Sequence, residues 1–313
     1  MISVILATHN GERTLERTLD ALRSLHIPGE GAEFIAVNNA STDRTKQILQ
    51  EFCKGLPLRV LDEPRPGKSF ALNLGIRHAN GDILLFTDDD VIPSSHWLLA
   101  FSEAAAAKPQ ISLFAGQVRH SWEKDPPRWL ARLAEEGRSF AGTPASLEPG
   151  PVSAAYVKGC NFMVRSHVCE DIRFSEDGGI NFTGQATSQG GEDTDFVKRC
   201  LEVGYTTWYV PTAVNRHIVR QEQIGLVPVV RRYFRIGRAG ARQGPGATKP
   251  RPVMLFGYPR YLYRVIPVEV GLAAIDWFGG RKYKAAHRLV DVAMTCGRAH
   301  QNKLMQQRSH AVE

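Results

Sequence analysis

The chain has 313 residues, of which 43% are hydrophobic and 23% charged, with a formal net charge of +7 at pH 7. This composition is typical of a soluble globular protein with one large or two modest domains. No run of 18 or more apolar residues is present, which argues against a membrane-spanning helix. We also expect no signal peptide, because Met1–Val4 lack a basic start.

Charge is distributed unevenly along the chain. From His217 onward there are 17 Lys and Arg against 5 Asp and Glu, so this part carries +12, whereas the first 216 residues carry −5. A basic segment after an acidic one predicts contact with an anionic surface. No base-stacking or groove-reading module is visible, so we expect an anionic membrane surface, and not nucleic acid, as the partner.

The cysteines give a prediction of cellular location. They are an odd number without Cys-x-x-Cys spacing, at Cys53, Cys160, Cys169, Cys200 and Cys296. This pattern is typical of reduced, mostly buried thiols in a cytosolic protein. We therefore expect a cytoplasmic protein, to which the basic segment adds a peripheral position on the inner face of the membrane.

The first ninety residues alternate short apolar runs with helical patterns. Strands are predicted at Ile2–Ala7, Phe34–Val37, Leu58–Leu61 and Ile83–Phe86, with helices between them at Leu15–Leu25, from a Ser41 or Thr42 N-cap to Glu51, and at Phe70–Ile76. This alternation predicts parallel strands with helices on both faces. Pro66–Ser69 is not a P-loop, because that motif needs a first glycine at position 62, which is Asp. No Gly-x-Gly-x-x-Gly follows the first strand, which argues against a dinucleotide-binding fold.

The strand Ile83–Phe86 leads into Thr87 and three acids, Asp88, Asp89 and Asp90. Open α/β sheets bind their ligands at the carboxyl ends of strands. Adjacent carboxylates repel one another unless a cation or a donor-rich ligand neutralises them, and Mg²⁺ or Mn²⁺ would do so and bring phosphates with it. The alternative for so short a motif is a solvated acidic turn that caps the next helix.

The middle of the chain is less regular. A helix from Pro93 to about Ala107 and a strand at Ile111–Val118 are followed by residues 121–151, whose five prolines indicate a long, partly ordered excursion. Strand character at 152–164 precedes a polar, Gly-rich segment at 174–189, predicted to be a mobile loop. A helix is then predicted to begin at Gly191–Asp195, and a strand at Thr206–Val210, with His217 just beyond it.

The last hundred residues have a different pattern. One face of a predicted helix carries Leu226, Val230, Tyr233, Phe234 and Gly237, and the other carries Arg231, Arg232, Arg235, Arg238 and Arg242. A flexible link is predicted at Gly240–Pro252, followed by interfacial aromatic residues such as Tyr261 and Trp277, and by a last helix near 281–300. We interpret this extension as a membrane-surface contact; the alternative is that its helices pack on the rest of the protein and its arginines are merely solvated.

Four separated segments resemble the family-2 glycosyltransferases of the GT-A fold, over roughly residues 1–217. They are Ser3–Asn10, Val37–Asp43, Asn73–Asp90 with its Asp-x-Asp ending, and Gly191–Asp195 with Gly204, Tyr205, Val210, Pro211 and His217. The resemblance implies an α/β, Rossmann-like mixed sheet flanked by helices. It places the catalytic domain at 1–219, with a nucleotide-binding half at about 1–119, an acceptor half at about 120–219, and the basic helical extension at 220–313.

The resemblance also assigns residues to the nucleotide and the metal. The nucleotide would be held by Thr8, His9, Asn38, Lys68, Asp88 and Asp89, and Mn²⁺ or Mg²⁺ by Asp90, Asp88 and His217. His9 stands where the family usually has tyrosine, and Asn38 where it usually has an acid. An amide donates as well as accepts, which leaves the base open, with a UDP-sugar as the expected donor. The alternative for His217 is a buried, hydrogen-bonded structural role.

On the acceptor side, the resemblance makes Asp193 the general base and places Glu192 and Asp195 beside the acceptor. Two alternatives are that Asp195 is the base, and that all three are first-turn acids that complement the helix dipole. The implied reaction is inverting and metal-dependent. It moves a sugar from a nucleotide sugar to a glycan or lipid-linked acceptor, in cell-surface polysaccharide or glycolipid synthesis.

Two other functions compete with this one. A catalytically silent carbohydrate-binding or scaffold protein of the same fold would be expected to have lost acids at 88, 90 or 193, and none is missing. A sugar-phosphate nucleotidyltransferase would need a Gly-rich, Arg-containing loop after the first strand, where Thr8–Arg13 contains one glycine.

Overall fold

The structure is a computed structural model that describes residues 1–309 except 54, 56, 178–189 and 243–252. The chain forms two compact units. One contains Met1–Glu123, Glu192–Val219 and most of the chain from Glu135 between them; the other contains Lys124–Ala134 and the chain from Arg220.

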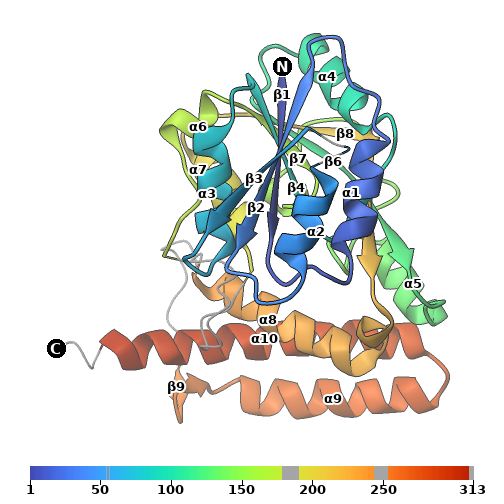
Figure 1. Ribbon diagram of the computed structural model, residues 1–313. Helices are drawn as coiled ribbons and strands as arrows, with labels where there is room; N and C mark the ends of the chain where they lie inside the picture. The colour runs from blue at the N-terminus through green and yellow to red at the C-terminus, as the bar shows by residue number, and fades with distance from the viewer. Residues whose placement is uncertain (54, 56, 178–189, 243–252, 310–313) are drawn as a thin grey trace. The chain divides into compact units, whose positions relative to one another are not determined.

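The first unit is built on an eight-stranded mixed sheet of order β3-β2-β1-β4-β7-β6-β8-β5 (Figure 1). Its strands are β1 (Ile2–Thr8), β2 (Ala32–Asn39), β3 (Leu58–Glu63), β4 (Ile83–Asp88), β5 (Val91–Pro93), β6 (Leu113–Trp122), β7 (Phe162–Arg165) and β8 (Thr207–Val219). The first four are parallel to one another, as the sequence predicts. β7 is antiparallel to β4 and β6, and β5 is antiparallel to β8, which makes the sheet mixed.

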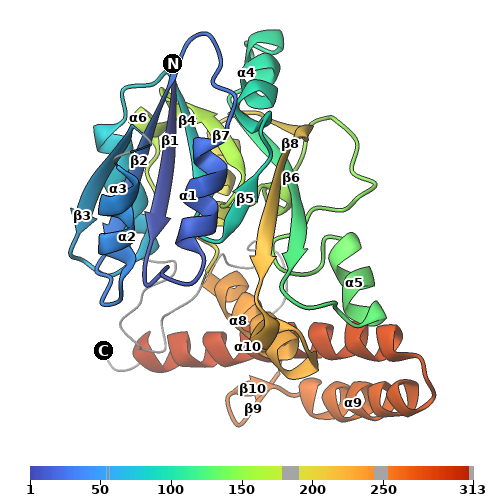
Figure 2. The ribbon, with the colours of Figure 1, turned by 45° about the vertical axis from the view of Figure 1, so that its right-hand side comes forward.

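Helices cover both faces of this sheet (Figures 1 and 2). One layer contains α1 (Leu15–Arg23), α2 (Thr45–Phe52) and α4 (Trp97–Ala107), and the other contains α3 (Lys68–His78), α6 (Val168–Asp171) and α7 (Glu192–Glu202). Side chains of β1 alternate between the two cores, with Val4 in the first and Ile5 in the second. Because both faces are buried at the centre of the sheet, the inner strands β1 and β4 are nearly continuous apolar runs and do not alternate with polar residues.

Several boundaries in the first unit differ from the sequence prediction. The N-cap predicted at Ser41 or Thr42 is wrong, because α2 begins at Thr45, whose backbone N–H donates to Asp43 Oδ1 at 3.0 Å. The strand predicted over 152–164 is confined to β7, after a 3-10 turn at Ala154–Tyr156. β8 continues to Val219, so His217 lies inside this strand and not beyond it.

The proline-rich segment 121–151 is more ordered than predicted. β6 runs to Trp122, and α5 (Arg128–Glu135) begins directly after Pro126 and Pro127. Proline is tolerated at the start of a helix because the first backbone N–H groups have no partner within the helix. Most of the segment predicted as a mobile loop at 174–189 lies outside the described residues.

The second unit consists mainly of α8 (Leu226–Arg242), α9 (Leu262–Phe278) and α10 (Lys282–Ser309), with a short hairpin of β9 (Met254–Leu255) and β10 (Tyr258–Pro259). The predicted apolar face of α8 is buried at Tyr233 and Gly237, and Val290 and Ala293 of α10 are buried as well. α9 was not predicted, because a helix that is apolar on most sides shows no helical period. Most of the predicted link at 240–252 lies outside the described residues.

Contacts between backbones hold α8 against α10. A Cβ atom on Gly237 would lie 1.9 Å from the carbonyl oxygen of Met294, and one on Gly297 would lie 2.0 Å from that of Phe234. Each glycine therefore allows the facing helix to approach more closely than any side chain would permit. Among the described residues, no helix combines the length and the apolar character needed to cross a bilayer.

Candidate active site

The carboxyl ends of β1, β2 and β4 meet at one edge of the sheet, because these strands are parallel neighbours. The register places Thr8 beside Asn38, and Asp88 beside the residue that precedes Thr8. The Thr8 hydroxyl donates to Asp89 Oδ2, which ties the turn after β4 to the end of β1. The residues predicted to hold a nucleotide are thus gathered at one place, including His9, whose Nδ1 donates to the Asn39 carbonyl oxygen at 2.6 Å.

Asn38, at the end of β2, has one end of its side-chain amide unpaired among the described residues. Its Nδ2 donates to Asp62 Oδ1 at 2.7 Å, and Asp62 also pairs with Lys46 at 2.8 Å. Asn38 Oδ1 is buried and has no hydrogen-bond partner among the described residues. Since Asp62 takes the donor end of the amide, the free end is an oxygen, as the carboxylate usual in the family would also offer.

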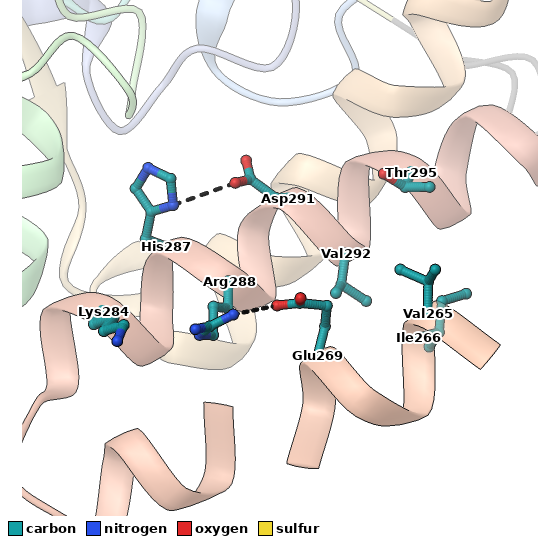
Figure 3. Close-up of a pocket in the computed structure, with 9 residues that line it drawn as sticks. All are labelled: Val265, Ile266, Glu269, Lys284, His287, Arg288, Asp291, Val292 and Thr295. Carbon is teal, nitrogen blue, oxygen red and sulfur yellow. Dashed lines mark hydrogen bonds and ion pairs between the residues drawn. The ribbon is translucent and has the colours of Figure 1, made fainter. Parts of the chain in front are cut away.

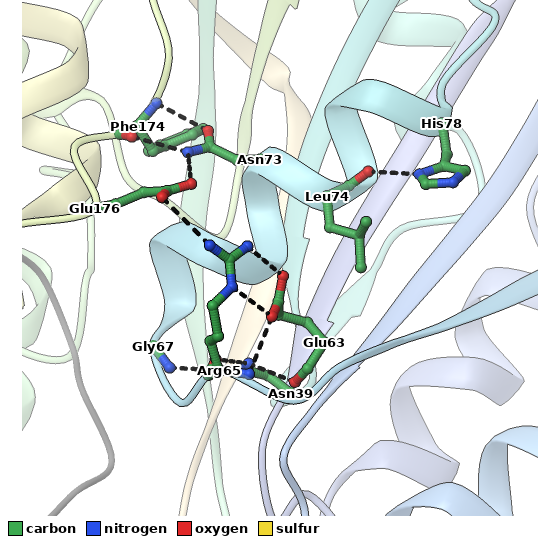
Figure 4. Close-up of polar contacts among 9 residues, drawn as sticks. All are labelled: Asn39, Glu63, Arg65, Gly67, Asn73, Leu74, His78, Phe174 and Glu176. Atoms are coloured by element: carbon green, nitrogen blue, oxygen red, sulfur yellow. Dashed lines mark hydrogen bonds and ion pairs between the residues drawn. The ribbon is translucent and has the colours of Figure 1, made fainter.

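Asn39 organises the turn that leads to Lys68, a role that the sequence analysis missed (Figure 4). Its Nδ2 donates to the Arg65 carbonyl oxygen at 2.7 Å, and its Oδ1 accepts from the Gly67 backbone N–H at 2.8 Å. Arg65 in turn pairs with Glu63 at 2.8 Å. This buried amide therefore fixes the start of α3, whose first residue is Lys68.

Figure 4 also shows how α3 holds the segment after α6. Asn73 Nδ2 donates to the Phe174 carbonyl oxygen at 2.9 Å and to Glu176 Oε1 at 3.0 Å, while Asn73 Oδ1 accepts from the Phe174 backbone N–H at 3.1 Å. Arg65 Nη1 lies 3.7 Å from Glu176 Oε2. Asn73 belongs to a motif of the sequence analysis, but its partners lie a hundred residues away and are not predictable from spacing.

Lys68 is the cationic centre of the edge. Its Nζ donates to Asp88 Oδ1 at 2.5 Å and lies 3.7 Å from Glu192 Oε1, and its side chain is only 14% exposed. Burial disfavours the ammonium form, but Asp88 and Glu192 raise the pKa of Lys68 well above its usual range. Lys68 therefore remains charged and links the end of β4 to the start of α7.

Negative charge exceeds positive charge around Lys68. Burial raises the pKa of Asp89 to about 7, with Asp90 adding to the rise and the Thr8 hydrogen bond opposing it. Burial likewise raises the pKa of Glu192 to about 7, opposed by Lys68. Buried carboxylates of this kind are stabilised as anions by added positive charge, which a divalent cation would provide.

Asp90 and His217 form a candidate metal centre. β5 follows Asp90 and runs antiparallel to β8, so that Val91 faces His217 and His217 Nε2 lies 3.3 Å from Asp90 Oδ2. A carboxylate oxygen beside an imidazole nitrogen fits Mn²⁺, and a carboxylate with phosphate oxygens fits Mg²⁺. Asp88, the third predicted ligand, is directed to Lys68. Among the described residues no three or more His, Cys, Asp or Glu side chains are arranged so that they alone could hold a metal ion, so a bound ion would also need oxygens from a ligand.

Asp193 is held from two sides at the start of α7. Its Oδ2 accepts from the Gly159 backbone N–H at 2.7 Å, and its Oδ1 accepts from the Thr194 backbone N–H at 2.8 Å. A Cβ on residue 159 would lie 3.0 Å from Asp193 Oδ2, so glycine permits this approach. The carboxylate is partly exposed and lies close enough to Lys68 to add to the rise in the pKa of that residue, which burial opposes and to which Asp88 and Glu192 contribute more.

Asp195 has different surroundings. Its Oδ2 accepts from Arg199 Nε at 3.0 Å, one turn further along α7, and Arg199 also donates to the Arg173 carbonyl oxygen at 2.7 Å. Such an i,i+4 pair stabilises a helix surface. The two acids predicted as alternative bases therefore differ: Asp193 contacts the chain before β7, and Asp195 contacts its own helix.

Asn161 connects the site to the sheet, and the sequence analysis assigned it no role. Its Oδ1 accepts from Trp97 Nε1 at 2.7 Å, and its Nδ2 donates to the carbonyl oxygens of Gln117 at 2.8 Å and Ala213 at 2.9 Å. The register of β6 against β8 shifts here, between Gly116 and Gln117. A fully buried amide with all its hydrogen bonds made specifies one arrangement of strands; only the polar residue in an apolar run hinted at it.

The mixed sheet, its two helical layers and the acidic edge at the ends of β1, β2 and β4 define a GT-A glycosyltransferase. Residues 3–173 match the family described as glycosyl transferase family 2, and the chain belongs to this family. It is 26% identical over 240 residues to glycosyltransferase AglE of Haloferax volcanii, covering 76% of this chain and 72% of that protein. It is 25% identical over 231 residues to the succinoglycan biosynthesis protein ExoM of Rhizobium meliloti, covering 73% of this chain and 70% of that one.

A solved structure has the same fold. The mannosyltransferase PcManGT from Pyrobaculum calidifontis, in complex with GDP-Man and Mn²⁺, aligns with a TM-score of 0.55 and 21% identity, covering 100% of this chain and 80% of that one. At this identity the likeness establishes the fold, and the roles of individual residues depend on the contacts described above.

Proposed function

We propose that this glycosyltransferase is inverting and metal-dependent and takes its sugar from a nucleotide diphosphate donor, with a UDP-sugar expected. The observation that carries the proposal is the pairing of Asp90 with His217 at 3.3 Å, on the edge that also holds Thr8, Asn38 and Lys68. The nucleotide end of the donor would meet Asn38 Oδ1, an acceptor without a partner among the described residues. Lys68 and the metal would meet the diphosphate.

The metal would be held by Asp90 and His217, with Asp88 near enough to contribute to the electrostatics of the same site. When bound, Mn²⁺ or Mg²⁺ acts as a Lewis acid that stabilises the charge of the departing diphosphate. Lys68 provides a second, fixed positive charge for this role. The relative named as a mannosyltransferase, solved with GDP-Man and Mn²⁺, supports a nucleotide-sugar donor and a divalent ion.

Asp193 would act as the general base. Two backbone N–H groups hold its carboxylate by 2.7 Å and 2.8 Å contacts, and each oxygen keeps a second lone pair for the proton of the acceptor hydroxyl. Glu192 would lie between the base and Lys68, and Asp195 further along the acceptor side. Direct displacement with such a base inverts the configuration of the transferred sugar.

The acceptor would be a glycan or a lipid-linked glycan in cell-surface polysaccharide or glycolipid synthesis, at the cytoplasmic face of a membrane. The relative named for succinoglycan biosynthesis supports polysaccharide synthesis as the process. The excess of 17 Lys and Arg over 5 Asp and Glu from His217 onward supports an anionic membrane as the surface at which the enzyme works.

The test is calorimetric titration of the protein with nucleoside diphosphates, with and without Mn²⁺. We expect metal-dependent binding that the Asp90→Ala variant loses, because a divalent ion holds diphosphate through carboxylate oxygens. Asp20→Ala, an exposed acid on α1, is the control for loss of negative charge. Undiminished metal-dependent affinity in the Asp90 variant would show that Asp90 is not a ligand. In a separate assay with a nucleoside triphosphate and a sugar 1-phosphate, release of pyrophosphate would indicate a nucleotidyltransferase.

A further inference from the structure

The exposed face of α9 is apolar along most of its length. Val265, Val268 and Ile275 are 47%, 59% and 62% exposed, and Phe278 at the end of the helix is 89% exposed. The whole of α9 is described, and the exposed positions from Val265 to Phe278 carry no charged side chain. Scattered exposed apolar residues are normal, but a continuous apolar helix face marks a contact with a partner or a membrane.

The acids of α9 point the other way, toward α10. Glu269 Oε2 lies 2.5 Å from Arg288 Nη1, a pair shown in Figure 3. Asp276, with a side chain only 5% exposed, pairs with Arg281 at 2.7 Å and with Arg288 at 3.1 Å. The two acids of α9 are therefore paired inside the unit, and its exposed face is left apolar.

Basic and aromatic residues flank this face at both ends. Arg260 and Arg264 lie at its start, and Arg281, Lys282 and Lys284 follow its end. Tyr261 and Tyr263 are 53% and 46% exposed, and Phe256, at the tip of the β9–β10 hairpin, is 80% exposed. Cationic and aromatic groups around an apolar helix are the pattern of an element that lies at the headgroup level of an anionic bilayer.

The length of the face defines its orientation. The stretch without an exposed charge, Val265–Phe278, rises about 20 Å at 1.5 Å per residue, which is shorter than the roughly 30 Å hydrocarbon core. Such a helix lies in the plane of the interface and does not cross the membrane.

We propose that α9, together with the tip of the β9–β10 hairpin, is the membrane-docking surface of this protein. The face that contacts the lipid is the apolar face of α9, and not the basic face of α8 that the sequence alone suggests. A second copy of the chain fits less well: whether two α9 helices pair parallel or antiparallel, their basic ends face basic ends, whereas anionic lipid complements both. The inference does not depend on glycosyl transfer.

A cavity partly lined by α9 is also mainly apolar. It has a volume of about 420 Å³ and is lined by residues of α8, α9, α10 and the hairpin, including Phe234, Tyr258, Ile266 and Cys296. Its mainly apolar lining is suited to an apolar group.

Flotation with vesicles tests the proposal. The full chain is mixed with phosphatidylcholine vesicles containing phosphatidylserine, and the bound fraction is compared for wild type and the double variant Val268→Glu/Ile275→Glu. We expect the variant to lose about tenfold or more in vesicle affinity, because two carboxylates would have to enter the interface. Val268→Leu/Ile275→Leu should bind like wild type, and Val227→Glu, a 58% exposed valine at the start of α8, should also retain binding.

Further measurements distinguish docking through α9 from docking through α8 and from self-association. All substituted residues are exposed, so the melting temperatures should match wild type. Failure of wild type to float with vesicles overturns the proposal, as does loss of binding in Arg231→Gln/Arg235→Gln with full binding by the Glu variant, which would assign docking to α8. A wild-type dimer in gel filtration that Val268→Glu/Ile275→Glu converts to monomer, without vesicle binding, would instead show a self-association surface.

Discussion

Replacing Asp193 by Asn tests the proposed base with little change in shape. In the wild type both carboxylate oxygens accept from backbone N–H groups, from Gly159 at 2.7 Å and from Thr194 at 2.8 Å. The amide of Asn can accept from one of these donors, but its NH₂ group then faces the other donor. One hydrogen bond is lost, which at this partly exposed position costs about 1 kcal/mol of unfolding free energy.

The expected loss of rate is much larger than this loss of stability. A general base contributes about 10²–10⁴-fold, or roughly 3–5 kcal/mol of transition-state stabilisation. Donor affinity should stay close to wild type, because Asp193 contacts neither Asn38 nor Lys68 directly. Asp195→Asn is the matched comparison: it removes one partly exposed ion pair with Arg199, worth about 0.5 kcal/mol, and should lower turnover far less than Asp193→Asn does, through acceptor placement alone.

The assay measures kcat for transfer, donor affinity and melting temperature for Asp193→Asn, Asp195→Asn and Glu192→Gln. A rate loss confined to Asp193→Asn, with donor binding retained, supports its role as base. If Asp195→Asn is inactive and Asp193→Asn active, the base is assigned to the wrong acid. If Asp193→Asn merely melts earlier and its folded fraction turns over normally, the residue is structural.

Two further predictions concern the second unit. Gly237→Ala and Gly297→Ala should each lower the melting temperature, because the new Cβ would lie 1.9 Å or 2.0 Å from a backbone carbonyl oxygen, and overpacking of about 1–3 kcal/mol or more outweighs the roughly 1 kcal/mol that Ala gains over Gly in a helix. Gly271→Ala in α9 is the control and should raise the melting temperature, because a Cβ there meets nothing within 4 Å. Equal gains in stability at all three positions would refute the close crossing of α8 and α10. Hydrogen bonds from Arg281 and, to a lesser extent, Arg288 lower the pKa of Asp276, although burial opposes this. Asp276 therefore contributes its full stabilisation above the unfolded pKa of about 3.9 and loses it as pH falls through the lower folded pKa. The melting temperature of Asp276→Asn should fall less steeply from neutral to acid pH than that of wild type, and parallel curves would contradict this.

The sequence predicts the parallel half of the sheet well, for a physical reason. Strands buried on both faces are continuous apolar runs, and the turns after them contain the polar residues of the site. β1, β2, β3 and β4 were found in this way, and with them the meeting of Thr8, Asn38 and Asp88 at one edge. The local sequence pattern is sufficient to predict this edge, because neighbouring parallel strands end at the same edge of a sheet.

The antiparallel half was predicted less well because its order depends on distant contacts. β5 is three residues long, and only its pairing with β8 makes it a strand and brings Asp90 to His217. Of the strand expected over 152–164, only β7 forms, and it begins directly after Asn161. The side chain of Asn161 bonds to Gln117 of β6 and Ala213 of β8, contacts that no local sequence pattern reveals. α9 gives no periodic signal, since its apolar residues occupy both its inner and its outer faces.

The proposed base and the proposed metal centre share one support. The Gly159 backbone N–H donates to Asp193, and Asn161 follows two residues later. The Asn161 amide in turn bonds to Gln117 of β6 and to Ala213 of β8, the strand that also contains His217. Asn215 Nδ2 adds a bond from β8 to the Cys160 carbonyl oxygen at 2.8 Å. Buried amides thus connect the two halves of the site, in addition to the contacts that each acid makes with its own helix or turn. This arrangement explains why the spacing of the acids in the sequence says so little about which of them can act together.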